Sequence, residues 1–407
     1  MSRTFDIFPE GRQFRPDGRC RLVARYERRD GTRVADTGEL WYEFEAWPEA
    51  LDAADADPFL MLTLPMAMEE ARELRVDGAV SRSLLANLSD FRDYWCGIAP
   101  LRYRPVGFAA SLCRDDAGDH PRPGAVALFS GGVDAAFTYW RHRHGLAGAA
   151  TQTLRQGVFV DGFDRASFLR RESFLAAYER SRRILADEPV PLATVRTNYR
   201  QVEAEPFASH HLHMIASSAA FLGSCLHLFK GMAGTGLYPS TFSYHEADQL
   251  RCCGTNPISD RFLSSAAFHI VHDGAGFQRI AKVAALQDWP VFWENARICG
   301  TPQADGRNCG RCEKCLRTLL AALLTSGRLP PAFPTPPADI VRLVTATKVK
   351  PNVRSHWQEM ARWAQEHGLH NPWAELAEAK GRKRWKERRH AFRAGLRELL
   401  RSLANPR

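Results

Sequence analysis

The stretch AVALFSGGVDAAFTYWRHR, residues 125–143, decides the fold. Its apolar start predicts a buried strand, Ser130, Gly131 and Gly132 a loop, and the following residues a helix. A glycine pair lets the backbone approach an anion, and a helix N-terminus directs free N–H groups at it. The stretch therefore predicts a phosphate-binding loop, although a simple tight turn fits these residues equally well. The lysine and spacing of GxxxxGKS/T are absent, and the loop is too short for GxGxxG.

Strand and helix patterns alternate from Ala125 onward. Further strands are expected at QGVFVDGFD (156–164), PLATVRTN (191–198) and KGMAGTG (230–236), with helices near 173–185 and 207–229 between them. This alternation predicts an α/β fold with a parallel sheet that helices cover on both faces. Ligands of such folds bind at the carboxyl ends of the strands, where the loop of residues 130–132 is expected.

The flanking regions have different patterns. RCRLVARYERR (19–29) and ELWYEFEA (39–46) alternate like half-buried strands, and a helical pattern follows them, so residues 1–118 are expected to form an α+β N-terminal domain. The turn-rich segment 113–124 is the expected linker to a central domain, residues 119–329. Beyond the proline-rich PPAFPTPP, residues 330–407 are expected to form a basic helical region.

Four of the ten cysteines crowd into CGTPQADGRNCGRCEKCLRT, residues 299–318. Without an apolar signal sequence we expect the protein to stay in the reducing cytoplasm, where clustered cysteines indicate a metal rather than disulfides. Two overlapping CxxC turns and a fourth thiolate can close a tetrahedral Zn²⁺ shell. An iron–sulfur cluster or free thiols are the alternatives. The predicted structural zinc ligands are Cys299, Cys309, Cys312 and Cys315.

A second basic feature lies in HDGAGFQRIAKVAAL, residues 272–286. Arg279 and Lys282 are three residues apart on an expected helix, so their side chains share one face and can meet the same polyanion. The alternative is a solvated helix face.

The residues Ser130 to Asp134, SGGVD after a hydrophobic strand, resemble the PP-loop of the ATP pyrophosphatase family, whose usual form is SGGxDS. The resemblance implies a HUP-like core (adenine nucleotide alpha hydrolase) that splits ATP into AMP and pyrophosphate while adenylating a carboxyl or carbonyl oxygen. Ala135 stands where the family usually has serine, so one hydroxyl donor to phosphate is missing.

The same resemblance implies roles for individual residues. The loop would hold the pyrophosphate part of ATP, Asp134 would lie near Mg²⁺, and Asp161 would lie beside the adenosine. Arg279 and Lys282 would hold ATP phosphates. The catalytic groups implied in this way are Asp134, Arg279 and Lys282, and the nucleotide-binding residues are Ser130, Gly131, Gly132, Asp134, Asp161, Arg279 and Lys282.

The SGGVD loop together with the cysteine cluster resembles the 7-cyano-7-deazaguanine synthases (QueC-like proteins) over roughly residues 125–325. This implies adenylation of a 7-carboxy-7-deazaguanine-type carboxylate and its transfer to an amine. The long flanking regions resemble additions to QueC-like proteins of anti-phage defence systems of the Qat and CBASS type, which implies an amine on a partner protein. The alternatives are nitrile synthesis with ammonia, a tRNA-modifying enzyme of the PP-loop type, and a nucleotide-binding scaffold without catalysis.

The net charge of +9 is concentrated at the end of the chain. Residues 380–401 hold ten Lys or Arg against two Glu, so 10 − 2 gives +8. An apolar face on the same expected helix favours docking onto the protein, and contact with nucleic acid or an acidic partner is the alternative. The longest apolar stretch, 214–229, is interrupted by polar residues and predicts a buried helix rather than a membrane span.

Overall fold

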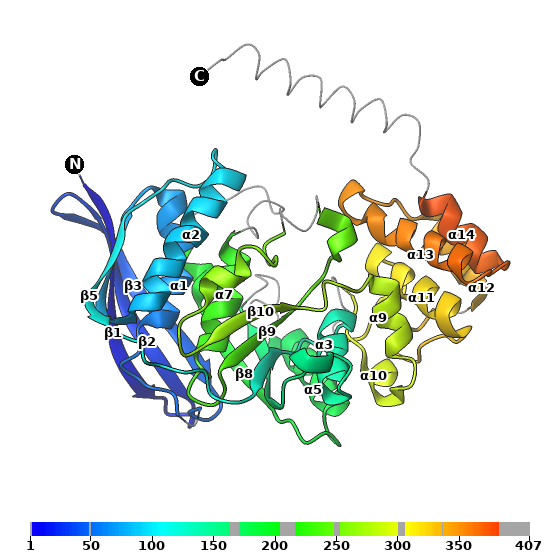
Figure 1. Cartoon of the computed structure of the whole chain (residues 1–407), viewed down its shortest axis with the longest axis horizontal. Coiled ribbons are helices and arrows are strands. Elements are labelled where there is room, and N and C mark those ends of the chain that lie inside the picture. Colours follow the sequence, from blue (N-terminus) through cyan, green and yellow to red (C-terminus); the bar gives the residue numbers. More distant parts are fainter. Residues whose placement is uncertain are drawn as a thin grey trace, which may run out of the picture.

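A 10-stranded sheet, mostly parallel, organises the chain (Figure 1). The structure, a computed structural model, describes residues 2–48, 50–162, 171–203, 216–247, 253–299, 306–335 and 337–381. In those residues the strand order is β10-β9-β6-β7-β8-β3-β2-β1-β4-β5. The prediction of an α/β fold with a largely parallel sheet is confirmed at this level.

The central strands are parallel and belong to the segment in which strands and helices alternate. They are β6 (Ala125–Leu128), β7 (Leu154–Asp161), β8 (Leu192–Thr197), β9 (Thr235–Pro239) and β10 (His269–Asp273). The chain proceeds from β6 through β7 to β8 on one side and then returns to place β9 and β10 on the other. The order therefore reverses at β6, and in open α/β sheets the crevice at this position is where ligands bind.

Helices pack on both faces of these strands. One apolar core joins the sheet to α1 (Asp57–Glu70), α2 (Arg82–Ile98) and α7 (Ala216–His227). The other core contains residues of α3 (Val133–Arg143), α5 (Arg171–Ile184), α9 (Arg279–Ala285), α10 (Pro290–Asn295) and α11 (Glu313–Ser326). In α3, Asp134 occupies the first turn and Arg141 to Arg143 the last, which matches the helix dipole at both ends.

The predicted strands at 156–164 and 191–198 are confirmed as β7 and β8, and the buried helix of the long apolar stretch as α7. The prediction of a strand at 230–236 was wrong, because β9 begins only at Thr235. Lys230 instead forms ion pairs with Asp55 and Asp57 at the start of α1. Gly231 lies so close to Ala50 that a Cβ atom on it would be 2.1 Å from the Ala50 carbonyl oxygen. Residues 228–232 form the turns that follow α7, in which the Lys230 N–H donates to the His227 carbonyl.

The N-terminal strands continue the same sheet. They are β1 (Arg3–Phe14), β2 (Cys20–Asp30), β3 (Arg33–Phe44), β4 (Glu73–Ser81) and β5 (Phe108–Arg114). β3 pairs antiparallel with β8, where Tyr42 faces Thr197. The Asn198 side chain extends this junction, since its Oδ1 accepts from Trp41 N at 2.9 Å and its Nδ2 donates to the Glu39 carbonyl at 2.8 Å. The division at residue 118 stays a prediction.

Helices form the opposite end of the molecule (Figure 1). After α11 come α12 (Pro337–Ala346), η4 (Pro351–Val353), α13 (Arg354–Glu366) and α14 (Pro372–Gly381). The short helical segments in other parts of the chain are η1 (Gly148–Ala150), α6 (Tyr199–Val202), η2 (Tyr244–Glu246) and η3 (Asp260–Leu263). The basic helix expected at the end of the chain lies outside the described residues from 382 onward. Across the described ranges, every helix is too short or too polar to cross a membrane.

Candidate functional site

The loop of residues 130–132 connects the carboxyl end of β6 to the N-terminus of α3, as expected. Ser130 is exposed and Gly131 is buried. Gly131 has φ of 72°, and a Cβ atom on it would lie 2.6 Å from the Ser181 Oγ atom. Only glycine fits this conformation and this close approach. The loop thus turns sharply and leaves the first N–H groups of α3 at the carboxyl end of β6.

Asp134, Arg279 and Lys282 are brought together from α3 and α9. The Arg279 Nη1 atom donates to Asp134 Oδ2 at 2.5 Å, and Lys282 Nζ lies 3.7 Å from Asp134 Oδ1. Arg279 and Lys282 are buried, and Asp134 keeps 18% of its side chain exposed. Burial raises the pKa of the Asp134 carboxyl, but Arg279 and Lys282 outweigh this effect and hold the pKa below its ordinary value. The three residues therefore form a charged cluster with one excess positive charge.

Three more cations from other elements surround this cluster. Lys314 and Arg317 lie in the first turns of α11, and Arg297 follows α10. The pKa of Lys314 is lowered to about 8, because the surrounding protein reduces its hydration and because Arg279 and other cations are near. The Lys314 side chain is nevertheless exposed, so a ligand can reach it from solvent.

Few carboxylates balance these cations. Arg317 is buried and pairs with Glu313, whose Oε1 atom lies 3.0 Å from Arg317 Nε. Glu313 also accepts a hydrogen bond from Trp357 Nε1 at 2.8 Å. No described carboxylate forms an ion pair with Lys314 within 4.0 Å. The positive charge gathered around the α3 N-terminus is therefore only partly neutralised, which suits a polyanion.

Asp161 ends β7, beside β6, so it lies at the same edge of the sheet as the loop. It is buried, and its Oδ2 atom lies 3.3 Å from Arg196 Nε and 3.5 Å from Arg171 Nη1. Burial raises the pKa of its carboxyl despite these two cations. In this structure Asp161 is paired with arginines, so an adenosine would have to share or displace these contacts.

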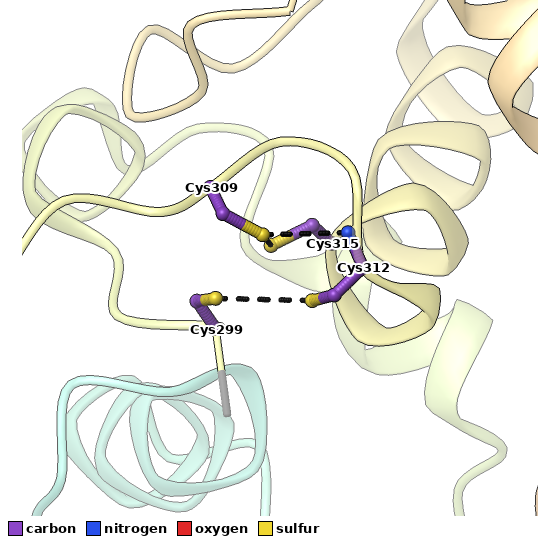
Figure 2. A group of neighbouring side chains, drawn as sticks. All are labelled: Cys299, Cys309, Cys312 and Cys315. Atoms are coloured by element: carbon purple, nitrogen blue, oxygen red, sulfur yellow. Dashed lines mark hydrogen bonds between the residues drawn. The ribbon is translucent and has the colours of Figure 1, made fainter. Parts of the chain in front are cut away.

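The four predicted zinc ligands meet in one place (Figure 2). The Sγ atoms of Cys299 and Cys312 are 3.8 Å apart, and those of Cys309 and Cys315 are 4.0 Å apart. Two sulfur ligands each about 2.3 Å from a tetrahedral Zn²⁺ lie about 3.8 Å apart. The cysteine cluster therefore has the composition and spacing of a closed, structural metal site.

This cysteine cluster fixes the segments that carry the additional cations. Cys299 comes two residues after Arg297, and Cys312 directly precedes α11, which carries Lys314. The Asn308 side chain holds the backbone at Cys299 in place, since its Oδ1 atom accepts from the N–H groups of Ile298 and Cys299 at 2.8 and 3.0 Å. A metal held here would position both cations beside the loop of residues 130–132.

A serine, a histidine and an aspartate are also aligned near this site. His272 Nε2 lies 2.9 Å from Ser240 Oγ, and His272 Nδ1 lies 2.8 Å from Asp260 Oδ2. The order resembles a hydrolase triad, but Ser240 is fully buried and donates its proton to the Phe242 carbonyl. Lys282 Nζ donates to the Ser240 carbonyl. We therefore interpret the group as a support for the end of β9 and for Lys282.

Sequence reasoning missed part of this arrangement. Arg297 carries no local signal, because only the fold brings it to Gly131, whose carbonyl accepts from the Arg297 N–H at 2.8 Å. Lys314 and Arg317, by contrast, are identifiable from their place directly after the last CxxC turn, where they either pair with Glu313 or, for Arg317, point into the site. Comparison with protein-family models, curated proteins and solved structures gave no significant match.

Proposed function

We propose that the chain is an ATP-dependent ligase that adenylates a carboxylate and passes the acyl group to an amine. The carboxylate oxygen would attack the α-phosphorus of ATP and release pyrophosphate. The amine would then attack the acyl carbon, lose a proton and release AMP. The observation that carries the proposal is the group of cations gathered around the N-terminus of α3 at the point where the strand order reverses.

The residues have distinct parts in this proposal. The loop of residues 130–132 and the free N–H groups of α3 would bind the pyrophosphate portion. Arg279 and Lys282 would stabilise the charge that builds up on the leaving pyrophosphate, as preorganised cations do in phosphoryl chemistry. Both are already fixed by Asp134, so little reorganisation is needed.

A Mg²⁺ ion bound with ATP would draw most of its ligands from phosphates and water. Asp134 fits as its protein ligand, because the Oδ1 atom of this carboxylate is buried and lacks a hydrogen-bond partner. The ion would neutralise phosphate charge. Asp134 would then be shared between the ion and the arginine that it holds in place.

The proposed substrate class follows from the motifs rather than from the geometry. The SGGVD loop and the four-cysteine cluster together favour a 7-carboxy-7-deazaguanine-type carboxylate. We further propose that the amine belongs to a partner protein in anti-phage defence, because large regions flank the central strands on both sides. The N-terminal strands and helices α12–α14 offer surfaces on which such a partner could be bound.

One observation favours a second candidate, a nucleotide-binding scaffold without catalysis. The Asp134 carboxylate is engaged by Arg279 and Lys282, and the neighbouring Ala135 side chain is buried in the core. No hydroxyl is therefore available at the position after Asp134. Such a site can bind a polyphosphate through its cations and still react slowly.

The deciding experiment is mass spectrometry of the products formed from Mg-ATP and 7-carboxy-7-deazaguanine. Reactions would contain ammonium, or proteins encoded beside this chain, or neither. AMP with a deazaguanine mass on a protein supports the proposed ligase, and AMP with a free nitrile identifies a synthase that uses ammonia. Tight ATP binding without AMP identifies the scaffold. No ATP binding at all contradicts the proposal.

A matched pair of variants ties the result to the site. Lys282→Gln should lower the rate of AMP formation at least about 100-fold, in the range measured when one preorganised charge donor is removed. Arg75→Gln removes a cation on β4 whose side chain is 59% exposed, and it should leave the rate unchanged. Equal effects of both variants would show that the reaction does not use this cluster.

A further inference from the structure

Three buried side chains beside the site of the proposed ATP chemistry direct polar atoms toward one another. Glu246 ends the short helical turn η2, and His356 and Glu359 lie three residues apart on one face of α13. Their exposed fractions are 4%, 2% and 3%. Neither the proposed ATP chemistry nor the four-cysteine cluster uses them. We call them the Glu–His–Glu group.

The atoms at the centre of this group lack partners. Glu246 Oε1, His356 Nδ1 and Glu359 Oε2 are each buried without a hydrogen bond. An unpaired buried polar atom costs about 1–3 kcal/mol, so three in one place indicate a missing ligand. Each also belongs to a residue type that binds metals.

The distances between these atoms fit a metal better than hydrogen bonds. His356 Nδ1 lies 3.4 Å from Glu246 Oε1 and 3.5 Å from Glu359 Oε2. N–H···O hydrogen bonds are usually about 2.7–3.2 Å long. Two ligands each about 2.1 Å from a tetrahedral metal lie about 3.4 Å apart. All three atoms are within 4.8 Å of one another.

The remaining atoms of the group are held in place. The Ser243 N–H donates to Glu246 Oε2 at 2.9 Å, and Ser243 Oγ lies 3.2 Å from both Glu246 Oε2 and Glu359 Oε1. The Phe242 ring stacks on the His356 ring at 5.2 Å with an angle of 5°. One oxygen of each glutamate is thus fixed, and the other faces His356. Ligands of metal sites are commonly oriented by such outer contacts.

The nearby arginines and lysines attract the two glutamates electrostatically, but within the described residues none of them forms an ion pair with Glu246 or Glu359 within 4.0 Å. Arg279 and Arg317 line a small cavity that also adjoins His356, but Arg279 pairs with Asp134 and Arg317 with Glu313. The cavity is about 10 Å³, roughly the space of one water molecule.

We propose that Glu246, His356 and Glu359 bind one divalent transition-metal ion of the Mn²⁺ to Zn²⁺ group. Two carboxylate oxygens and an imidazole nitrogen form a mixed donor set that suits Mn²⁺, Fe²⁺ and Zn²⁺, whereas Mg²⁺ and Ca²⁺ prefer oxygen ligands alone. This site shares no ligand residue with the proposed ATP site or with the cysteine cluster.

The position of the site gives the ion a structural role. It would join the segment after β9 to α13, elements that are more than 100 residues apart in the chain. The Arg279 backbone N–H, at the start of α9, also lies near the Glu359 carboxylate and favours its charged form. The bound ion would therefore hold α9, and with it the Arg279 side chain, in the orientation that meets Asp134.

Metal content of the full chain tests this inference. Mass spectrometry should find about two metal equivalents per wild-type chain and about one in Glu246→Gln and Glu359→Gln. Glu366→Gln, at the exposed end of α13, is the matched control and should keep both equivalents. Electron paramagnetic resonance of added Mn²⁺ provides a second readout, since a four-thiolate site does not select this ion. Each glutamate variant should weaken Mn²⁺ binding at least about 100-fold.

Cobalt distinguishes the two sites even if a glutamate variant folds poorly. Co²⁺ at the cysteines gives intense sulfur-to-metal charge-transfer absorption, and Co²⁺ at the Glu–His–Glu group gives only weak bands. Wild-type protein should take up a second Co²⁺ after the thiolate absorption is complete. If it takes up only the thiolate-bound ion and binds no Mn²⁺, the proposal is overturned, and a shared proton joins the two glutamates instead.

Discussion

The Asp134 carboxylate and the Arg279 guanidinium lie 2.5 Å apart, between Oδ2 and Nη1, and this contact joins the first turn of α3 to the first turn of α9. Asp134 follows the proposed phosphate loop, and Arg279 is the first residue of α9. Sequence separation between them is large, yet the fold makes them one electrostatic unit. Any change to either partner should therefore affect both stability and anion binding.

The Asp134–Arg279 pair should behave as coupled in a double-mutant cycle. Asp134→Asn and Arg279→Gln should each lower the free energy of unfolding by about 2 kcal/mol, because each removes the closest ion-pair partner of a largely buried charge. The loss in the double variant should be about 1–3 kcal/mol smaller than the sum of the two single losses. Urea denaturation at pH 7 measures all four forms. Additive losses would contradict the coupling.

The same pair predicts a pH dependence. Folding lowers the pKa of Asp134. The ion pair therefore makes its full contribution to the free energy of unfolding above the ordinary pKa of the carboxyl. The contribution is lost as the pH falls through the folded-state value. The difference in stability between wild type and Asp134→Asn should therefore be larger at pH 7 than below pH 4, and urea denaturation at both pH values checks this.

Lys314 should make anion binding depend on pH above neutrality. Its pKa of about 8 means that the ammonium loses its proton mostly between pH 7 and 9, below the pKa of about 10 to which burial and Arg279 lower that of Arg317. Affinity for inorganic tripolyphosphate should fall about 10-fold between pH 7 and 9.5 in the wild type, as one cation is lost. Lys314→Gln should bind more weakly at pH 7 and change little up to pH 9.5. Calorimetric titration at several pH values measures the affinity of both proteins. An equal fall in affinity with pH in the wild type and in Lys314→Gln would contradict this role of Lys314.

Gly131 should not tolerate a side chain. Gly131→Ala places a Cβ atom at φ of 72° and 2.6 Å from Ser181 Oγ, so the free energy of unfolding should fall by about 2 kcal/mol and phosphate binding should weaken. Ser181→Ala in the same chain should recover part of the loss by removing the clash. Gly97→Ala, in α2 with open space around it, is the control and should be neutral or stabilising. Equal losses at both glycines would contradict the argument.

Sequence patterns predicted the central part of this fold because its signals are local. The apolar run before Ser130, the glycine pair and the spacing of Arg279 and Lys282 each follow from a few adjacent residues. The fold then brought the two cations to Asp134, next to the loop. The cysteine cluster was equally local, with two overlapping CxxC turns.

Nonlocal contacts could not be predicted in this way. The pairing of β3 with β8 depends on Tyr42 facing Thr197, and no pattern in either strand identifies the other. His356 and Glu359 show a helical spacing, but Glu246 lies more than 100 residues earlier. The segment after Lys230 was misassigned as a strand for the same reason, since its ion pairs reach back to Asp55 and Asp57.

The cysteine cluster should stabilise both the fold and the anion site. Cys315→Ser removes a buried ligand and should abolish the thiolate-bound metal and lower Tm by at least about 5 °C. Affinity for tripolyphosphate should fall about 10-fold, because Arg297 and Lys314 flank the cluster. Cys113→Ser changes an exposed cysteine and should alter none of these. Retention of the metal and of Tm in Cys315→Ser would show that the four cysteines do not form a metal site.

Lys230 should couple the N-terminal segment to the central sheet. Its Nζ atom lies 2.6 Å from carboxylate oxygens of both Asp55 and Asp57, and all three side chains are largely buried. Lys230→Met leaves two adjacent carboxylates without a cation, so the free energy of unfolding should fall by about 3 kcal/mol at pH 8. Lys350→Met, at an exposed position, should have little effect.

Acid should partly rescue the Lys230→Met variant. The pKa of Asp55 is already raised to about 6 in the wild type by burial and by Asp57, although Lys230 opposes the shift. Without Lys230 the pKa of both carboxyls in the folded state should rise. A carboxyl whose pKa is higher in the folded than in the unfolded state makes the fold less stable as the pH rises. The deficit relative to the wild type should therefore be smaller at pH 5 than at pH 8 in urea denaturation. A deficit that does not change with pH would mean that Lys230 contributes through packing rather than through charge.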